Sequence, residues 1–235
     1  MITTDPAVLV LEDGATTQKE LLSDVGNPRS IAVGADGTVS LSQISDSDPI
    51  RQYPPGSTEP RALPDDFKAR TTTALATTSD GDLYAFGLDT YSKIVVLKRG
   101  STTPTVLLDF HLGQGPNAVR DNGDMYGTGG STTDADILRV RAGTTNAEKL
   151  HLTGLTDRVL RLAVNHQGDV FVLGVHCANG SYSCPEGFRV LRFANGTTTP
   201  TELPFTGLTN PQGIAVTDDT VYLTDGTRVL AMKFV

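Results

Sequence analysis

The 235-residue sequence contains no Trp, only two Cys and few aromatic residues, which make up 6% of the chain. Hydrophobic residues reach 38%, so the core must be built mainly from aliphatic side chains. No apolar run approaches the roughly 18 residues that a transmembrane helix requires. The first residues, MITTDPAVLV, have no basic segment ahead of an apolar stretch and therefore do not predict a secretory signal.

The sequence also lacks any cluster of Lys and Arg. It carries 27 acidic against 19 basic residues, a net charge of −8. Binding to nucleic acid needs a basic surface that displaces counterions from the phosphates. We therefore expect no nucleic-acid partner.

What the sequence has in abundance is Gly (24) and Pro (13), together with Thr and Val. Thr and Val favour strands, and Gly and Pro interrupt them, so the composition predicts an all-β fold. One pattern recurs, in which an apolar triplet, a tight polar turn and an apolar alternation follow one another. The copies are SIAVGADGTVSL (30–41), ALATTSDGDLYAF (74–86), NAVRDNGDMYGT (117–128), LAVNHQGDVFVL (162–173) and GIAVTDDTVYL (213–223).

A second pattern follows each copy except the last, with two apolar runs around a Gly-Thr, Gly-Ser or similar turn, as in RFANGTTTPTELPF (192–205). Such a pattern is typical of a hairpin. Each unit thus has four short strands, a to d, in about 45 residues, which predicts the blade of a β-propeller. Strand a lies nearest the crowded axis and should carry a small residue. The same position of that strand holds Ala32, Ala76, Ala118, Ala163 and Ala215.

Counting the units predicts one propeller domain over residues 1–235 with five blades, six being the alternative. The blades are expected at 30–64, 74–110, 117–152, 162–205 and 213–235. The last blade ends without a d strand, so residues 17–22 are predicted to supply it. The ring would then be closed by the N-terminal strand, and the run from Val8 to Leu11 is left over.

The last unit reads Pro211-Gln212-Gly213-Ile214-Ala215-Val216, then Val221-Tyr222-Leu223-Thr224-Asp225, then Arg228-Val229-Leu230. This pattern resembles the NHL repeat. The flanking phrase TELPFTGLTNPQG and the hairpin before it resemble the extracellular propeller sensor of PknD-type mycobacterial receptor Ser/Thr kinases. The resemblance is strong over 188–235 and fades toward the N-terminus.

The resemblance implies an extracellular or cell-surface sensor domain that binds a protein, a cell-wall glycan or another ligand and catalyses nothing itself. In that family the domain is tethered to a membrane and a cytosolic kinase, and it usually has six blades. The present chain has no kinase motif. The alternatives are a propeller enzyme, a lyase or lactonase with a site in the central channel, and a free secreted NHL binding protein. An RNA-binding NHL domain is disfavoured by the acidic charge.

Binding is expected on the side of the blades that carries the b–c and d–a loops, because these loops vary whereas the a–b and c–d turns repeat. The longest b–c loop is GVHCANGSYSCPEG (174–187). The predicted contact residues are Asp46, Asp48, Asp89, Tyr91, Asp134, Asp136, Arg158 and Tyr182. The aspartates could also hold calcium, although no loop has the pattern of an EF-hand.

Cys177 and Cys184 both lie in this longest loop, which favours a disulfide and an oxidising compartment. Two reduced cysteines, or a metal held together with His176, are the alternatives. Neither a metal nor a cofactor is expected, because His111 and His151 close d strands at the rim and His166 lies in an a–b turn. A channel enzyme would need inward-pointing polar residues near the starts of the a strands, where the sequence offers only Asn117, Asn165 and Asn210.

Overall fold

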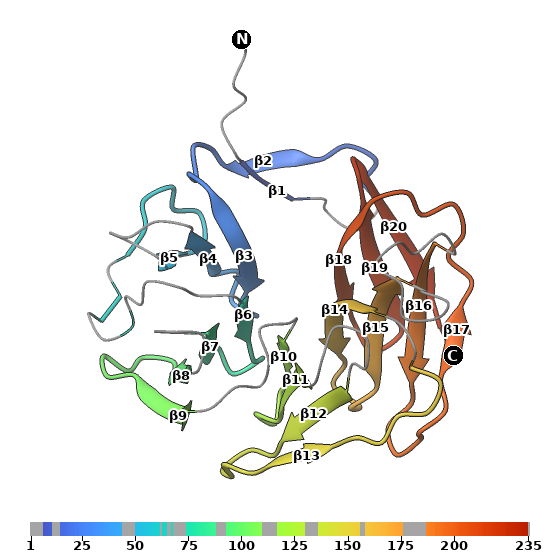
Figure 1. The fold of residues 1–235 in the computed structure, drawn as a ribbon. Helices are drawn as coiled ribbons and strands as arrows, with labels where there is room; N and C mark the ends of the chain where they lie inside the picture. Colours follow the sequence, from blue (N-terminus) through green and yellow to red (C-terminus); the bar gives the residue numbers. More distant parts are fainter. Residues whose placement is uncertain are drawn as a thin grey trace. The chain divides into compact units, whose positions relative to one another are not determined.

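The computed structural model of the protein is all-β (Figure 1). It describes residues 7–10, 15–43, 50–61, 63–64, 67, 74–87, 93–109, 117–129, 136–155, 158–175 and 187–234. Within these ranges there is no α-helix, and hence no helix long and apolar enough to cross a membrane. The chain divides into two compact units, Met1–Asp109 and Phe110–Val235, which are described in turn.

The first unit contains three antiparallel sheets. Their strands are β1 (Val8–Val10) and β2 (Lys19–Leu22); β3 (Pro28–Val33), β4 (Val39–Gln43) and β5 (Ile50–Tyr53); and β6 (Ala74–Thr77), β7 (Leu83–Gly87), β8 (Lys93–Leu97) and β9 (Thr105–Asp109). A bridge between Gln52 and Arg61 stands where the second of these sheets would have its fourth strand.

The second unit also contains three antiparallel sheets. They consist of β10 (Asn117–Val119), β11 (Met125–Gly129), β12 (Asp136–Val140) and β13 (Ala147–Lys149); β14 (Arg158–Val164), β15 (Val170–Val175), β16 (Phe188–Phe193) and β17 (Thr201–Leu203); and β18 (Pro211–Val216), β19 (Thr220–Asp225) and β20 (Arg228–Lys233).

Five of these sheets begin with a predicted a strand and continue in sequence order, each strand beside the next. The prediction of a five-bladed β-propeller is confirmed, and the blades are called blade 1 to blade 5 in chain order. The run that the repeat count left over, Val8 to Leu11, contributes β1, which pairs with β2. Pairing of residues 17–22 with blade 5 would join the two units, whose relative placement is not determined, so the ring closure stays a prediction.

Blades pack through a row of side chains that starts at the predicted alanine. In blades 2, 3 and 4 the alanine stands opposite an aromatic residue of strand b, in the pairs Ala76–Tyr84, Ala118–Tyr126 and Ala163–Phe171. These aromatic side chains are at most 4% exposed. In the second unit, Ala163 and Phe171 of blade 4 share a core cluster with Val221 and Leu223 of blade 5. A small residue beside a large one lets neighbouring sheets interlock closely.

Blade 5 departs from this explanation. Ala215 stands opposite Tyr222, as the repeat predicts, yet Ala215 is exposed and Tyr222 is 39% exposed. Burial alternates along β19, whereas all five positions of β7 are buried. Crowding therefore accounts for the alanines of blades 3 and 4 but not for Ala215.

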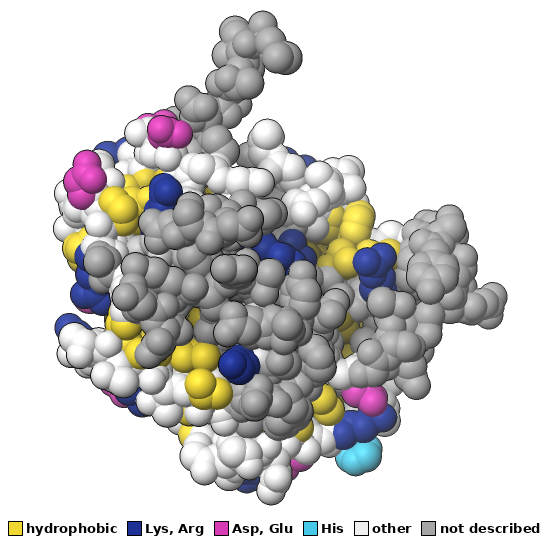
Figure 2. Space-filling model, turned by 60° about the vertical axis from the view of Figure 1, so that its left-hand side comes forward, with side chains coloured by type: hydrophobic (Ala, Val, Ile, Leu, Met, Phe, Trp, Pro, Cys, Tyr) yellow, Lys and Arg dark blue, Asp and Glu magenta, His cyan; other side chains and the backbone are white. Residues whose placement is uncertain are grey.

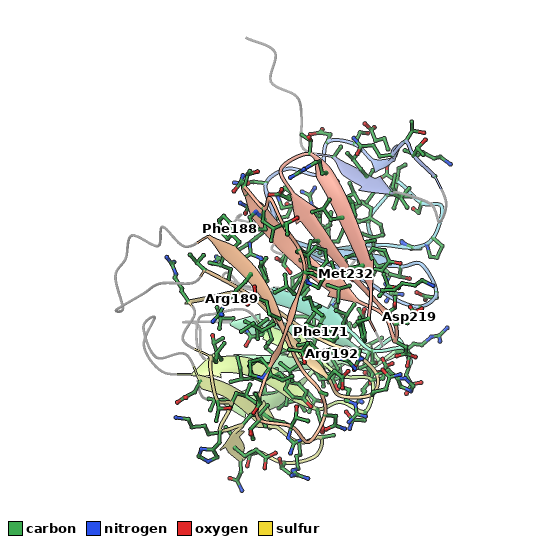
Figure 3. All side chains as sticks on the ribbon, turned by 90° about the vertical axis from the view of Figure 1, so that its right-hand side faces the viewer. Phe171, Phe188, Arg189, Arg192, Asp219 and Met232 are labelled. Atoms are coloured by element: carbon green, nitrogen blue, oxygen red, sulfur yellow. The ribbon has the colours of Figure 1, made fainter. Side chains whose placement is uncertain are left out.

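The other face of blade 5 is well packed, and the end of the chain strengthens it. Phe234, just after β20, lies against Phe171 with 5.0 Å between the ring centroids. The guanidinium of Arg192 sits 4.6 Å from the centre of the Phe234 ring and also binds Asp169 at 2.9 Å. Figure 3 shows Phe171 and Arg192 close together beside the sheet. These contacts fasten blade 5 to blade 4.

Within each blade the a–b and c–d turns share one end of the sheet, called the turn end. In blades 1 to 4 the a–b turn closes with a glycine in the left-handed region, such as Gly123 (φ 88°) and Gly168 (φ 92°), where a Cβ would be strained. The next residue in blades 2, 3 and 4 is an aspartate that accepts a backbone N–H of the c–d turn. The pairs are Asp82 with Arg99 at 3.0 Å, Asp124 with Ala142 at 2.9 Å and Asp169 with Asn195 at 2.8 Å.

This repeated aspartate bracket fixes the two turns to each other, and it can be tested in blade 3. Asp124 is 8% exposed. Asp124→Ala would leave the N–H of Ala142 without its acceptor, so we expect a loss of about 1–3 kcal/mol in the free energy of unfolding, measured by urea denaturation. Asp124→Asn, which keeps one acceptor oxygen, should lose less. Asp80→Ala in an exposed turn is the control, and an equal loss in the control would contradict the bracket.

Candidate functional site

The opposite end of each blade, called the loop end, carries the b–c and d–a connections. The b–c connections are 44–49, 88–92, 130–135, 176–187 and 226–227, so they differ widely in length. The a–b turns, in contrast, are 34–38, 78–82, 120–124, 165–169 and 217–219. Variation is thus concentrated at the loop end, as the sequence predicted.

Many of the residues proposed for binding lie outside the described residues. These are Asp46, Asp48, Asp89, Tyr91, Asp134 and Tyr182, together with both members of the predicted disulfide, Cys177 and Cys184. His111 and His176 lie outside them as well. Whether these side chains come together stays a prediction.

Asp136 and Arg158 are described, and both stand at the loop end. Asp136 begins β12 and forms an ion pair with Lys149 of β13 at 2.6 Å. This partner was not expected from the sequence, and it gives Asp136 a role in joining the outer strands of blade 3. Arg158 begins β14 and is exposed.

At the loop end of blade 4, Arg158, Val175 and Phe188 form one row across strands β14, β15 and β16. Opposite residues in neighbouring strands point to the same side of a sheet, so these three side chains share one face. Val175 and Phe188 are partly buried and hold the two ends of the longest loop, 176–187. Figure 3 shows Phe188 and Arg189 at this end of β16. The row therefore fixes the two strand ends that flank that loop.

At the loop end of blade 5, a buried carboxylate holds the d–a connection. Asp225, which is 2% exposed, accepts the backbone N–H groups of Asn210 at 2.6 Å and Thr209 at 3.1 Å. It also receives a hydrogen bond from Arg228. Gln43 stands at the same position of β4 and donates to the carbonyl oxygen of Val25. The sequence shows Asp225 as part of the repeat motif but does not predict that it holds the d–a connection.

The three candidates for a channel site are not equivalent. Asn117 begins β10 and Asn210 precedes β18, so both stand at the loop end. Asn165 follows β14 at the turn end, where its amide oxygen accepts the N–H of Asp169 at 2.8 Å. His166 is in the same turn, 3.3 Å from Asp218. Among the described residues, no group of three or more His, Cys, Asp or Glu side chains could hold a metal ion.

No protein-family model and no curated protein sequence matches the chain. Solved structures do match. A chain in the crystal structure of a nidogen–laminin complex is 19% identical, with a TM-score of 0.71 over 96% of this chain and 84% of that one. A gluconolactonase from Xanthomonas campestris is 12% identical, with a TM-score of 0.68 over 98% and 79%.

Virginiamycin B lyase from Staphylococcus aureus is 15% identical, with a TM-score of 0.53 over 88% of this chain and 70% of that one. Identities this low show the shared β-propeller fold and nothing of the ligand. Of these three proteins, one was solved in a complex with another protein and two are enzymes.

The Asp225 network makes a prediction about pH. The N–H of Asn210, followed by Arg228 and Thr209, holds the pKa of Asp225 below its ordinary value of 3.8. A carboxylate with a lowered folded-state pKa stabilises the fold above its unfolded pKa, and this stabilisation is lost as the pH falls through the folded value. Asp225→Asn should therefore lower the Tm at pH 7, and its difference from the parent should shrink below about pH 4.

The control is Glu59→Gln, which changes an exposed carboxylate. A Tm difference between Asp225→Asn and the parent that stays constant from pH 7 to pH 2.5 would refute the charged role of Asp225.

Proposed function

We propose that this chain is the ligand-binding propeller of a receptor-type bacterial Ser/Thr protein kinase, that it acts outside the cytoplasm, and that it catalyses nothing itself. The ligand is a protein or a cell-wall glycan, bound at the loop end. Binding would reorient or cluster a membrane tether. The observation that carries the proposal is the contrast between the two ends of the blades.

At the turn end, side chains hold the turns to one another. The aspartate brackets of blades 2, 3 and 4 connect a–b to c–d turns, and Arg120 donates to the carbonyl oxygen of His166 in the next blade at 2.9 Å. These contacts support a structural role. At the loop end, connections of different length rise from fixed strand ends, an arrangement in which binding residues are common.

The residues that resemble the NHL repeat support the family assignment within this proposal. Pro211 and Gly213 flank a bulge at the start of β18, and Asp225 and Arg228 form the two ends of a tight β19–β20 turn. The residues of the repeat motif over 211–230 thus make the contacts that shape the loop end of blade 5. The nidogen–laminin complex adds that this fold occurs in a protein–protein complex.

The enzyme reading is kept as a second candidate because the structure of a gluconolactonase is among the matches. Asn117 begins the inner strand β10 and Asn210 directly precedes the inner strand β18, so both stand at the loop end. In this reading they would line a channel site. Hydrolysis of gluconolactone by the purified protein, abolished by Asn117→Ala, would favour the enzyme over the sensor.

The binding proposal is tested at the longest loop. Replacing 177–186 with a short Gly-Ser turn keeps Val175 and Phe188, so blade 4 should fold and the Tm should change little. Co-sedimentation with isolated bacterial cell-wall material should fall about tenfold or more, and Tyr182→Ala should reproduce much of that loss because aromatic residues dominate binding surfaces.

Thr145→Ala, in the exposed c–d turn of blade 3, serves as the matched control at the turn end. Binding that survives the loop replacement but is lost in Thr145→Ala would place the contact surface at the turn end and overturn the proposal.

A further inference from the structure

The inner strand of blade 4 carries two exposed arginines. Strand β14 has β15 as its only strand neighbour in the sheet, and it lies next to β10 and β18, the a strands of blades 3 and 5. In a propeller these strands surround the central channel. Arg158 and Arg161 are both exposed on β14. Within the second unit β14 is the charged a strand, since β10 and β18 carry no charged residue.

A β-bulge places the two guanidinium groups on the same side. Arg158 pairs with Val175 and Arg161 with Leu173, and the register shifts between Val159 and Arg161. Val175 and Leu173 are two residues apart, so they face the same side of the sheet, and their partners face that side with them. Without the bulge, residues three apart would point to opposite faces. Bulges commonly re-aim side chains beside functional sites.

The described surroundings leave this positive charge uncompensated. Arg161 donates a hydrogen bond to the carbonyl oxygen of Leu160 at 2.7 Å. This acceptor is neutral, so it does not offset the positive charge of the guanidinium group. On the neighbouring blade 5 the carboxylate of Asp225 already accepts two N–H groups and binds Arg228. Asp157, which precedes Arg158, lies outside the described residues. Figure 2 shows that Lys and Arg side chains also occur at other places on the surface of the molecule.

We propose that Arg158 and Arg161 form a binding site for an oxyanion, a carboxylate or phosphate group of a small ligand. The guanidinium group is planar and presents paired N–H donors that match these anions. Phe188 lies in the same row as Arg158 and on the same face of the sheet. An apolar ring of the ligand, next to the anionic group, would therefore contact Phe188. The inference rests on the proposed function, since the oxyanion belongs to the ligand bound at the loop end.

The probes are inorganic phosphate and glucuronate, titrated at low ionic strength, where charge interactions are weakly screened. Binding is followed by chemical-shift changes of backbone amides in β14 and β15. We expect saturable binding of at least one probe and no binding of neutral glucose. Arg158→Gln and Arg161→Gln should each weaken it about tenfold or more, because each removes hydrogen bonds to a charged group. Saturation by phosphate or by glucuronate identifies which oxyanion the site prefers.

Arg99→Gln is the control, because it removes the same charge at the exposed turn end of blade 2. An equal loss in this control would show a general charge effect and overturn the site, as would failure of both probes to saturate. Such a failure, with cell-wall binding still lost on replacement of 177–186, would refute the oxyanion site and leave the proposed function standing.

Discussion

A blade of a propeller has two apolar faces, and neither can be left to water without cost. Burying one face of a four-stranded sheet requires a neighbouring blade, and that neighbour then needs another. The structure meets this demand through the pairing of a small residue on strand a with a large one on strand b, as in Ala118–Tyr126 and Ala163–Phe171. The sheets approach closely where the alanines stand, and the aromatic rings fill the space beyond.

This demand is not met on every face of the sheets. Tyr222 occupies the aromatic position of blade 5 and is exposed, and in the first unit Leu9 and Leu21 of the β1–β2 hairpin are 49% and 41% exposed. The other face of that hairpin is covered, since Val8 and Leu22 pack with Val39 and Leu41 of blade 1. Large apolar side chains are exposed on other sheets as well, at Ile31 and Val33 of β3 and at Val106 of β9.

A scaffold held in this way can vary its loops without losing its fold. The aspartate brackets of blades 2, 3 and 4 each join the two turns of a blade, and Asp225 ties the d–a connection of blade 5 to its sheet. At the loop end of blade 4, the strand ends that flank 176–187 belong to a row that contains Arg158 and Phe188. The positions of binding residues are therefore set by strands, while their identity is free to change.

The fold could be predicted because its repeat is written into the sequence. Periodic alanines, turn glycines and apolar runs identified the blades and their strand order. The bulge at Val159–Arg161, the ion pair of Asp136 with Lys149 and the engagement of Asp225 could not be predicted. Each depends on register or on contacts between segments distant in sequence, which composition and spacing do not encode. The pairing of β1 with β2 was missed for a related reason, because a repeat count treats an extra strand as a remainder.

The central claim is that the turn end is a rigid support, and amide hydrogen exchange tests it most directly. The N–H groups of Arg99, Ala142 and Asn195 lie in turns at the surface, where amides ordinarily exchange quickly, but each donates to a bracket aspartate. We predict that these three amides exchange as slowly as those of the adjoining strands. Exchange as fast as in an unstructured peptide would contradict the account.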